Sequence, residues 1–446
     1  KAAVFGTAIL GSNPRAPAIM KNLIKKLFNS RQKNELTYIS FEKLKVESEV
    51  VKIFRAISKY SKNSEIRYVG GCVRKVLNKE KTDDIDLAVN LEPKTVCNIL
   101  KKENIKYFES GIDHGTITAK IGNQKFEITS LRRDLIPDGR HSKVEFCESW
   151  YEDASRRDFT INSIYSDING NLYDPFNGRQ DLKNQSIKFI GDPEKRIQED
   201  YLRILRYVRF FLNYTKLKHD LEIKKVIKKN IDGISKISSE RLIEELKKIV
   251  LSKGFLNLAK DEFSIEIIQL IFPQLKNIRI FKNLDEHSIS IINKKDFIFL
   301  ISIMIIDETD NTDYFLYKYN LSNEEKKRIK FLHKYFSKPI GSNFFNKDNL
   351  WKVYYLNNKN YLEDLINFKI FKSKNQNTKL INLKKYFSDK TCPRFPIKAE
   401  TLMNNYNLRE GKELGIKLKE IENTWLNNNF KISDDEIKNI VKIKNI

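Results

Sequence analysis

The fold is decided by Gly70-Gly71-Cys72-Val73-Arg74 together with Asp84-Ile85-Asp86, in a chain of 446 residues. The apolar residues from Ile66 to Val69 predict a short strand that stops at the glycine pair. The apolar spacing that follows predicts a helix as far as Leu77, and the alternation from Asp84 to Val89 predicts a second strand. This order of strand, Gly-Gly, helix and Asp-x-Asp strand is much more specific than either motif alone.

Asp84 and Asp86 stand at positions i and i+2 of the second strand, so their side chains are expected on one face. Two like charges this close repel each other unless a divalent cation lies between them. Hard carboxylate oxygens suit Mg²⁺, and such a pair can hold two ions about 4 Å apart. We therefore predict two Mg²⁺ ions, one that activates a 3′-hydroxyl and one that binds a triphosphate. An isolated Asp-x-Asp is more often a solvated strand edge, so the surrounding order carries the prediction.

Two further segments place groups beside this pair. Residues 116–121 and 125–129 alternate and are joined by Gly122-Asn123, which predicts a hairpin. Glu127 then points outward on a neighbouring strand, either as a third metal ligand or as a group behind the ligands. The Gly70-Gly71 turn lets backbone N–H groups approach a phosphate, and Arg74 is expected to pair with phosphate oxygens.

Composition narrows the class of protein. The formal net charge of +24 favours a polyanionic partner such as nucleic acid, although a Lys-, Asn- and Ile-rich coding bias gives the same surplus. The four cysteines form no CxxC pair, which argues against a disulfide framework or a structural zinc site: Cys72, Cys97, Cys147 and Cys392. The longest apolar run, 297–306, is too short to span a bilayer and predicts a buried helix, so no membrane partner is expected.

After about residue 195, helical spacing dominates almost to the end. The predicted class is α+β: a catalytic head with a small mixed or antiparallel sheet and flanking helices, then an all-α neck, body and tail. The predicted boundaries are 1–40 for a leader or disordered segment, 41–183 for the head, 184–252 for the neck, 253–365 for the body and 366–446 for the tail.

The first 34 residues contain no acidic side chain. Three interpretations fit: a targeting presequence, a weak signal peptide, or sequence upstream of a start at Met20, which we favour. The expected location is the cytoplasm, or an organellar matrix if this segment is a presequence.

Taken together, these segments resemble the polymerase-β-like nucleotidyltransferases, and within them the bacterial-type (class II) tRNA nucleotidyltransferase and poly(A) polymerase family. The resemblance is close over about residues 64–250, and Lys75 departs from it where an acidic residue often stands. Besides the glycine and aspartate motif it is carried by His114-Gly115-Thr116, Phe126-Glu127-Ile128-Thr129, Arg156-Arg157-Asp158-Phe159-Thr160-Ile161-Asn162, Asp174-Pro175-Phe176 with Gly178 and Asp181-Leu182, and Glu199-Asp200-Tyr201-Leu202-Arg203.

The resemblance implies roles for several of these residues. Arg157, Asp158 and Asn162 are expected at the ribose and triphosphate, although Asp158 also fits a helix cap. Asp200 and Arg203 are expected to select the base, with Arg206 and Arg209 serving the triphosphate. Residues 132–140 resemble a flexible loop that helps the pocket switch from CTP to ATP, and a plain surface loop is the alternative; its charged residues include Arg133, Asp138 and Arg140.

Base selection also has a physical argument. Asp200 and Arg203 stand at i and i+3, which predicts one shared helix face. Cytosine and adenine both present an amino donor beside a ring-nitrogen acceptor, whereas uracil and guanine reverse this order. A carboxylate and a guanidinium side by side therefore accept C and A, and a mismatched base costs roughly 2–4 kcal/mol in unpaired charged groups. The alternative is an ordinary amphipathic helix with an ion pair.

The predicted function is addition of CCA to the 3′ end of tRNA from CTP and ATP, with release of pyrophosphate. Residues 395–425 look like the family tail that touches the tRNA elbow, and no DNA partner is expected. Two alternatives stay open: a poly(A) polymerase, which shares the head motifs, and a catalytically idle RNA-binding protein. His219-Asp220 is the single HD pair in the sequence and lacks further metal-spaced partners, so metal binding there is not expected.

Overall fold

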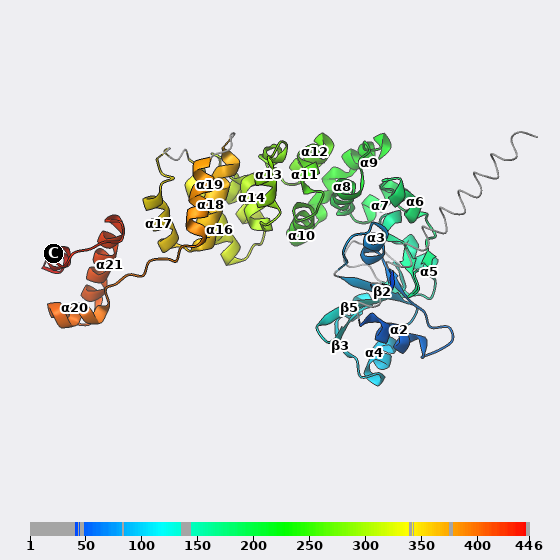
Figure 1. Cartoon of the computed structure of the whole chain (residues 1–446). Helices are drawn as coiled ribbons and strands as arrows, with labels where there is room; N and C mark the ends of the chain where they lie inside the picture. The colour runs from blue at the N-terminus through cyan, green and yellow to red at the C-terminus, as the bar shows by residue number, and fades with distance from the viewer. Residues whose placement is uncertain are drawn as a thin grey trace, which may run out of the picture. The chain divides into compact units, whose positions relative to one another are not determined.

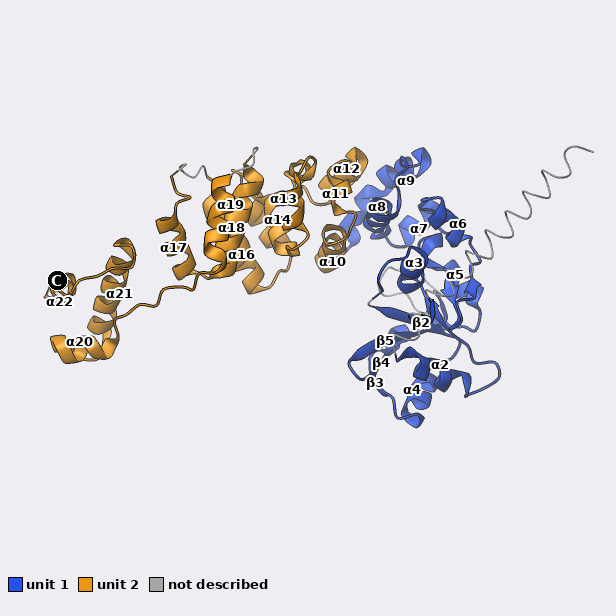
Figure 2. Ribbon diagram, viewed as in Figure 1, with its two compact units in different colours: residues 1–237 blue, residues 238–446 orange. Residues whose placement is uncertain are grey.

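The computed structural model describes residues 41–446 apart from 43, 45–48, 83, 135–143, 339–340, 342, 374–377 and 443–446. The chain forms two compact units, residues 1–237 and residues 238–446, which are coloured separately in Figure 2. The predicted leader, 1–40, lies outside the described residues.

The first unit is built on a mixed sheet in the order β3-β4-β5-β2-β1-β8-β9, with a separate ribbon of β6 and β7. β2 and β5 run parallel, and the other neighbouring strands run antiparallel. The strands are β1 (Ile66–Val69), β2 (Ile85–Val89), β3 (Lys106–Gly111), β4 (Thr116–Ile121), β5 (Gln124–Ser130), β6 (Arg132–Asp134), β7 (Val144–Phe146), β8 (Tyr165–Ser166) and β9 (Leu172–Tyr173).

Helices pack around this sheet, and Figure 1 shows α2 and α4 together beside the strands. The helices of the first unit are α2 (Val50–Ser58), α3 (Gly71–Leu77), α4 (Pro93–Lys102), α5 (Trp150–Ser155), α6 (Gly178–Lys183), α7 (Pro193–Glu199), α8 (Arg203–Tyr214) and α9 (Leu221–Asn230), with 3-10 turns η1 (Ile112–His114), η3 (Thr160–Asn162) and η4 (Ile231–Lys236).

The two faces of β2 bury different clusters. Ile85, Leu87 and Val89 join the larger core with residues of α2, α3 and α4, as the period-two pattern predicts. Ala88 belongs to a smaller cluster with Ala154 of α5. Because side chains alternate along a strand, Asp86 shares the face of Ala88, and the carboxylates therefore lie on the α5 side of the sheet.

All the regular elements in the described residues of the second unit are helices. It contains α10 (Ser239–Val250), α11 (Phe255–Leu258), α12 (Glu262–Ile271), η5 (Ile278–Phe281), α13 (Glu286–Ile292), α14 (Phe297–Ile305), α15 (Asn311–Lys318), α16 (Asn323–Phe336), α17 (Lys347–Leu356), α18 (Lys359–Lys372), α19 (Thr378–Ser388), α20 (Ala399–Tyr406), α21 (Lys412–Asn427) and α22 (Asp434–Lys442). Every residue of α14 is buried, which confirms the helix predicted in the apolar run. The last three helices share a cluster built around Leu402, Leu414, Ile421 and Ile437.

The fold class is confirmed: an α+β head is followed by helices. The boundary at 237/238 falls inside the neck predicted at 184–252, and the finer division into neck, body and tail remains a prediction. In the described part of the chain, no helix is long and apolar enough to cross a membrane.

Candidate active site

The two aspartates lie at the start of β2. Asp86 is the second residue of the strand and is half-buried, whereas Asp84 stands just in front of it and is exposed. Glu127 lies directly beside Asp86 across the parallel β2–β5 pair. Glu127 is therefore on the neighbouring strand, as predicted from the sequence.

Asp86 is affected by burial and by its two acidic neighbours. Burial, followed by the charges of Glu127 and Asp84, raises the pKa of Asp86. Among the described residues, no group of three or more His, Cys, Asp or Glu side chains converges as a ready metal site. The donor set nevertheless fits a divalent cation, because carboxylate oxygens are its preferred ligands and a cation would offset the repulsion that Asp86 experiences.

The glycine pair forms a tight turn above Asp86. Gly70 has a φ of +65°, which favours glycine, and a Cβ there would lie 3.4 Å from Nη1 of Arg157. A Cβ on Gly71 would lie 3.7 Å from Oδ2 of Asp86. The N–H of Gly70 donates to the carbonyl of Ile164, so this N–H is already used within the protein.

Arg74 makes contacts that the sequence did not predict. Its side chain is buried, and Nη1 donates to Oδ1 of Asn162. Its guanidinium lies over the rings of Phe210 at 4.7 Å and Tyr214 at 5.1 Å. These contacts join α3 to α8. The guanidinium also stays close to the glycine turn, because a Cβ on Gly71 would lie 3.9 Å from Nη2 of Arg74.

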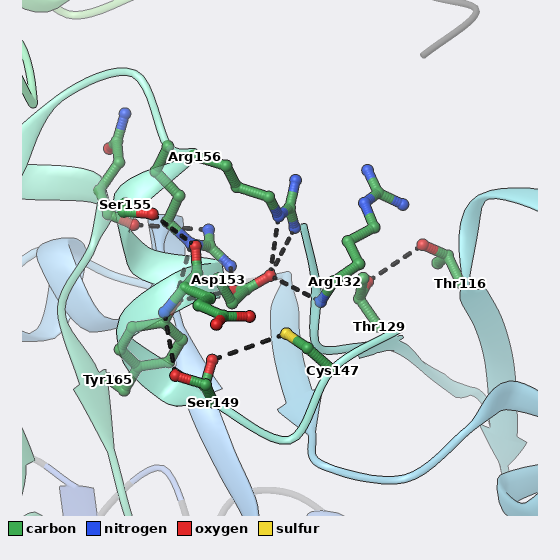
Figure 3. A network of polar contacts seen from close by, with 12 residues as sticks. Thr116, Thr129, Arg132, Cys147, Ser149, Asp153, Ser155, Arg156 and Tyr165 are labelled. Atoms are coloured by element: carbon green, nitrogen blue, oxygen red, sulfur yellow. Dashed lines mark hydrogen bonds and ion pairs between the residues drawn. The ribbon is translucent and has the colours of Figure 1, made fainter. Parts of the chain in front are cut away.

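Asp153 of α5, which no sequence motif marked, is the centre of a network that includes the first residues of the Arg156–Asn162 segment. Figure 3 shows Asp153 with Arg156, Arg132 and Tyr165 around it. Its carboxylate accepts hydrogen bonds from Arg156, Arg157 and Tyr165. The spacing of Asp153 from the two arginines, i+3 and i+4, was the available signal, but it looks the same as an exposed helical ion pair.

Asp158 and Asn162 are brought together as predicted. Oδ1 of Asp158 accepts from the side-chain amide of Asn162 at 2.8 Å and from the N–H of Phe159. Oδ2 accepts from Arg206 at 2.6 Å. Burial opposes ionisation, but Arg206 and these hydrogen bonds outweigh it and lower the pKa of Asp158 to about 2. Arg206 thus lies beside the predicted ribose residues, while Arg209 lies over the ring of Phe210.

The expectation that Asp200 and Arg203 share one helix face is wrong. α7 ends at Glu199, Asp200 is extended with φ −155° and ψ 102°, and α8 begins at Arg203. Oδ1 of Asp200 accepts from the N–H of Leu202, and Nη1 of Arg203 donates to Glu199. The two residues flank a break between helices, and the single amphipathic helix considered as the alternative is also excluded.

The first residues of the predicted flexible loop belong to a strand. Residues 132–134 form β6, which pairs with β7, and Arg133 makes an ion pair with Glu145 at 2.8 Å. Asp138 and Arg140 lie outside the described residues.

Two other sequence observations are explained by packing. His219 stacks on Phe211 with ring centroids 3.4 Å apart and lies 3.0 Å from the hydroxyl of Tyr207, while Asp220 caps α9. All four cysteines are free thiols, as their scattered positions predicted.

The chain is similar to known protein families and to individual proteins of known name. Residues 66–188 match the Poly A polymerase head domain family, and residues 216–278 match a family described as the probable RNA and SrmB-binding site of polymerase A. A human protein named mitochondrial CCA tRNA nucleotidyltransferase 1 is 32% identical over 399 residues, which cover 85% of this chain and 87% of the human one. A CCA-adding enzyme of Lactobacillus helveticus is 41% identical over 189 residues, 42% of this chain and 46% of that protein.

Solved structures agree on the fold. The Bacillus stearothermophilus CCA-adding enzyme in complex with CTP matches with a TM-score of 0.64 at 19% identity, over 88% of this chain and 96% of that one. The Thermotoga maritima CCA-adding enzyme complexed with tRNA matches with a TM-score of 0.58 at 20% identity, over 88% and 95%. With a human relative matched along most of both sequences, the chain belongs to the CCA tRNA nucleotidyltransferase family, which carries the poly(A) polymerase head domain.

Proposed function

We propose that this protein adds CCA to the 3′ end of tRNA, taking the nucleotides from CTP and ATP and releasing pyrophosphate. The observation that carries the proposal is the position of Asp86 beside Glu127 and below the Gly70-Gly71 turn, with Arg157 at the same turn. Relatives named for CCA addition, and structures of such enzymes with CTP and with tRNA, support the same reaction.

Nucleotidyltransferases of this type generally depend on metal ions. We assign two Mg²⁺ ions to Asp84 and Asp86, with Glu127 as a further ligand or as a group behind them. When bound, such ions lower the pKa of an attacking hydroxyl and neutralise the leaving pyrophosphate. Asp86 is half-buried beside two other carboxylates, and a bound cation would relieve the repulsion between them.

The remaining residues hold the nucleotide. Arg157 lies at the Gly70 turn, where its positive charge suits a triphosphate. Asp158 and Asn162 are assigned to the ribose, and Arg206 holds Asp158 from α8. Arg74 is assigned to the phosphates, since its guanidinium lies near Gly71, and it also holds the side chain of Asn162.

Asp200 and Arg203 are assigned to base selection, from the two sides of the break between α7 and α8. An extended residue at this break can turn its carboxylate away from the helix axis, and Glu199 restrains the guanidinium of Arg203. Acceptance of C and A by a carboxylate and a guanidinium then follows from the donor and acceptor order of the bases.

A poly(A) polymerase is the second candidate, because the matched head domain carries that name. It predicts incorporation of ATP without CTP, whereas CCA addition needs both. The proposed location is the cytoplasm or an organellar matrix, since the human relative is named as mitochondrial.

The test is incorporation of labelled CTP and ATP, offered separately and together, into tRNA that ends before the CCA. We expect CTP to be added first, and ATP only after two cytidines. Asp86→Asn should lower incorporation by at least ~1,000-fold, because a metal ligand is lost. Glu92→Gln is the control, since Glu92 is exposed at the start of α4, which packs on the opposite face of the sheet. Incorporation of ATP alone would favour the polymerase, and full activity of Asp86→Asn would refute the metal assignment.

A further inference from the structure

We propose that Asp153 is a positioning residue for the nucleotide site: its buried carboxylate fixes the guanidinium of Arg157 beside the Gly70 turn before the nucleotide arrives. The inference rests on the proposed function and deepens it, because it names the group that orients one side chain of the pocket. Asp153 itself lies on α5 and is not assigned to the nucleotide.

The carboxylate of Asp153 is fully engaged. Oδ1 accepts from Nε of Arg156 at 2.9 Å, from Nη2 of Arg156 at 2.7 Å and from the N–H of Arg132 at 3.4 Å. Oδ2 accepts from the hydroxyl of Tyr165 at 2.7 Å and from Nη2 of Arg157 at 3.1 Å. One side chain therefore ties together α5, the first residue of β6 and strand β8.

Burial makes this arrangement rigid. The side chain of Asp153 is 2% exposed. Burial opposes the charge, but Arg157 and Arg156 outweigh it and hold the pKa of Asp153 well below its usual range. A buried carboxylate that stays ionised needs its cations in place, so moving either guanidinium away leaves an unpaired charge inside the protein.

Arg157 is held from three directions. Its Nη2 binds Asp153, its Nε donates to the hydroxyl of Tyr165 at 3.1 Å, and its Nη1 faces the carbonyl of Asn162 at 3.4 Å. The guanidinium also lies over the ring of Tyr165, 5.3 Å from its centre. A free arginine side chain loses rotamer entropy when it binds a ligand, and this framework removes that loss beforehand.

The held guanidinium lies at the site. A Cβ on Gly70 would lie 3.4 Å from Nη1 of Arg157, and a Cβ on the next residue, Gly71, would lie 3.7 Å from Oδ2 of Asp86. The orientation of Arg157 therefore acts on the space between the glycine turn and the carboxylates, which the proposed function assigns to the nucleotide.

Asp153→Asn tests the inference, since it keeps the side-chain size but removes the charge that both arginines bind. We expect the KM and the directly measured Kd for CTP to rise about tenfold, with the KM for tRNA unchanged and kcat less affected. Asp364→Asn is the matched control: Asp364 is 1% exposed and held by Lys295 and Arg328 in the second unit. Both variants should lose thermal stability, and only Asp153→Asn should weaken CTP binding.

Tyr165→Phe serves if Asp153→Asn does not fold. It removes one hydrogen bond to Asp153 and one from Arg157 without leaving a new buried charge. We expect it to raise the Kd for CTP about threefold at nearly unchanged melting temperature. An unchanged Kd for CTP in Tyr165→Phe, or an equal rise in the KM values for CTP and tRNA in Asp153→Asn, would overturn the inference. A wild-type protein that adds neither nucleotide would instead contradict the proposed function.

Discussion

Asp158 keeps its charge inside the protein because Arg206, Asn162 and the N–H of Phe159 stabilise it. Its pKa is about 2 in the folded protein, against an ordinary value of 3.8. A lowered folded-state pKa contributes stability that is present above the ordinary value and is lost as the pH falls through the folded one.

We therefore expect the free energy of unfolding of wild type to drop by roughly 1 kcal/mol more than that of Asp158→Asn between pH 5 and pH 3. Urea unfolding at the two pH values measures the free energy of unfolding of each protein. Comparing the change between pH 5 and pH 3 removes any constant loss of stability caused by the substitution. An equal change in the free energy of unfolding of the two proteins would show that Asp158 is not charged in the way the structure indicates.

Among the elements, the break between α7 and α8 carries the assignment of base selection. Glu199 bridges Arg196 and Arg203, at 2.6 Å from each guanidinium. Glu199→Gln removes the charge that restrains Arg203, and we expect UTP incorporation relative to CTP to rise roughly three- to tenfold. Glu194→Gln is the control on the same helix, since Glu194 pairs with Lys229 of α9. Competition between labelled CTP and UTP gives the ratio, and equal ratios in both variants would remove Glu199 from the selection.

The start of α6 depends on a close approach between backbone segments. A Cβ on Gly178 would lie 2.0 Å from the carbonyl oxygen of Thr160, so Gly178→Ala must move the backbone. We expect a loss of about 1–3 kcal/mol, as for other overpacked sites. Gly415→Ala, inside α21 with open space around it, should instead raise stability by about 0.5–1 kcal/mol. Thermal melting of the two variants in opposite directions is the expected result.

How far the sequence predicts each element depends on whether its signal is local. β1, β2, β4 and β5 were predicted because alternation and the Gly122-Asn123 turn are local patterns. The break at Asp200 was missed because neither glycine nor proline marks it. Tertiary contacts accompany it instead: the ring of Tyr201 packs so closely on Gly233 that a Cβ there would lie 1.9 Å away.

In the site, too, residues marked by a local pattern were predicted, and residues that depend on tertiary contacts were not. Asp84, Asp86 and Glu127 follow from strand periodicity, whereas the role of Asp153 depends on Tyr165, which reaches it from β8. The phosphate role of Arg74 stays a prediction, whereas its contacts with Asn162 and with the rings of α8 depend on residues far away in the sequence and could not be predicted locally.

At the scale of the whole molecule, the net charge of +24 predicts how tRNA binding responds to salt. Lysines and arginines that contact phosphates release condensed counterions, so affinity falls steeply as salt increases. We expect the KM for tRNA to rise at least about tenfold between 50 and 200 mM KCl, while the KM for CTP rises much less. Steady-state kinetics at four salt concentrations measures both values. A tRNA KM that is independent of salt would mean that the charge reflects composition and not RNA binding.

The parallel pairing of Asp86 with Glu127 also limits where codons can be inserted into the gene or deleted from it. One codon inserted in β2 just before Asp86 would move Asp86 to the face of the larger core and Leu87 to the opposite face, because strand side chains alternate, so both the core and the site would be disrupted. The same insertion between residues 78 and 84 leaves the pairing untouched. Insertions and deletions among homologous sequences should therefore occur in the connections between strands and be absent from β2 and β5.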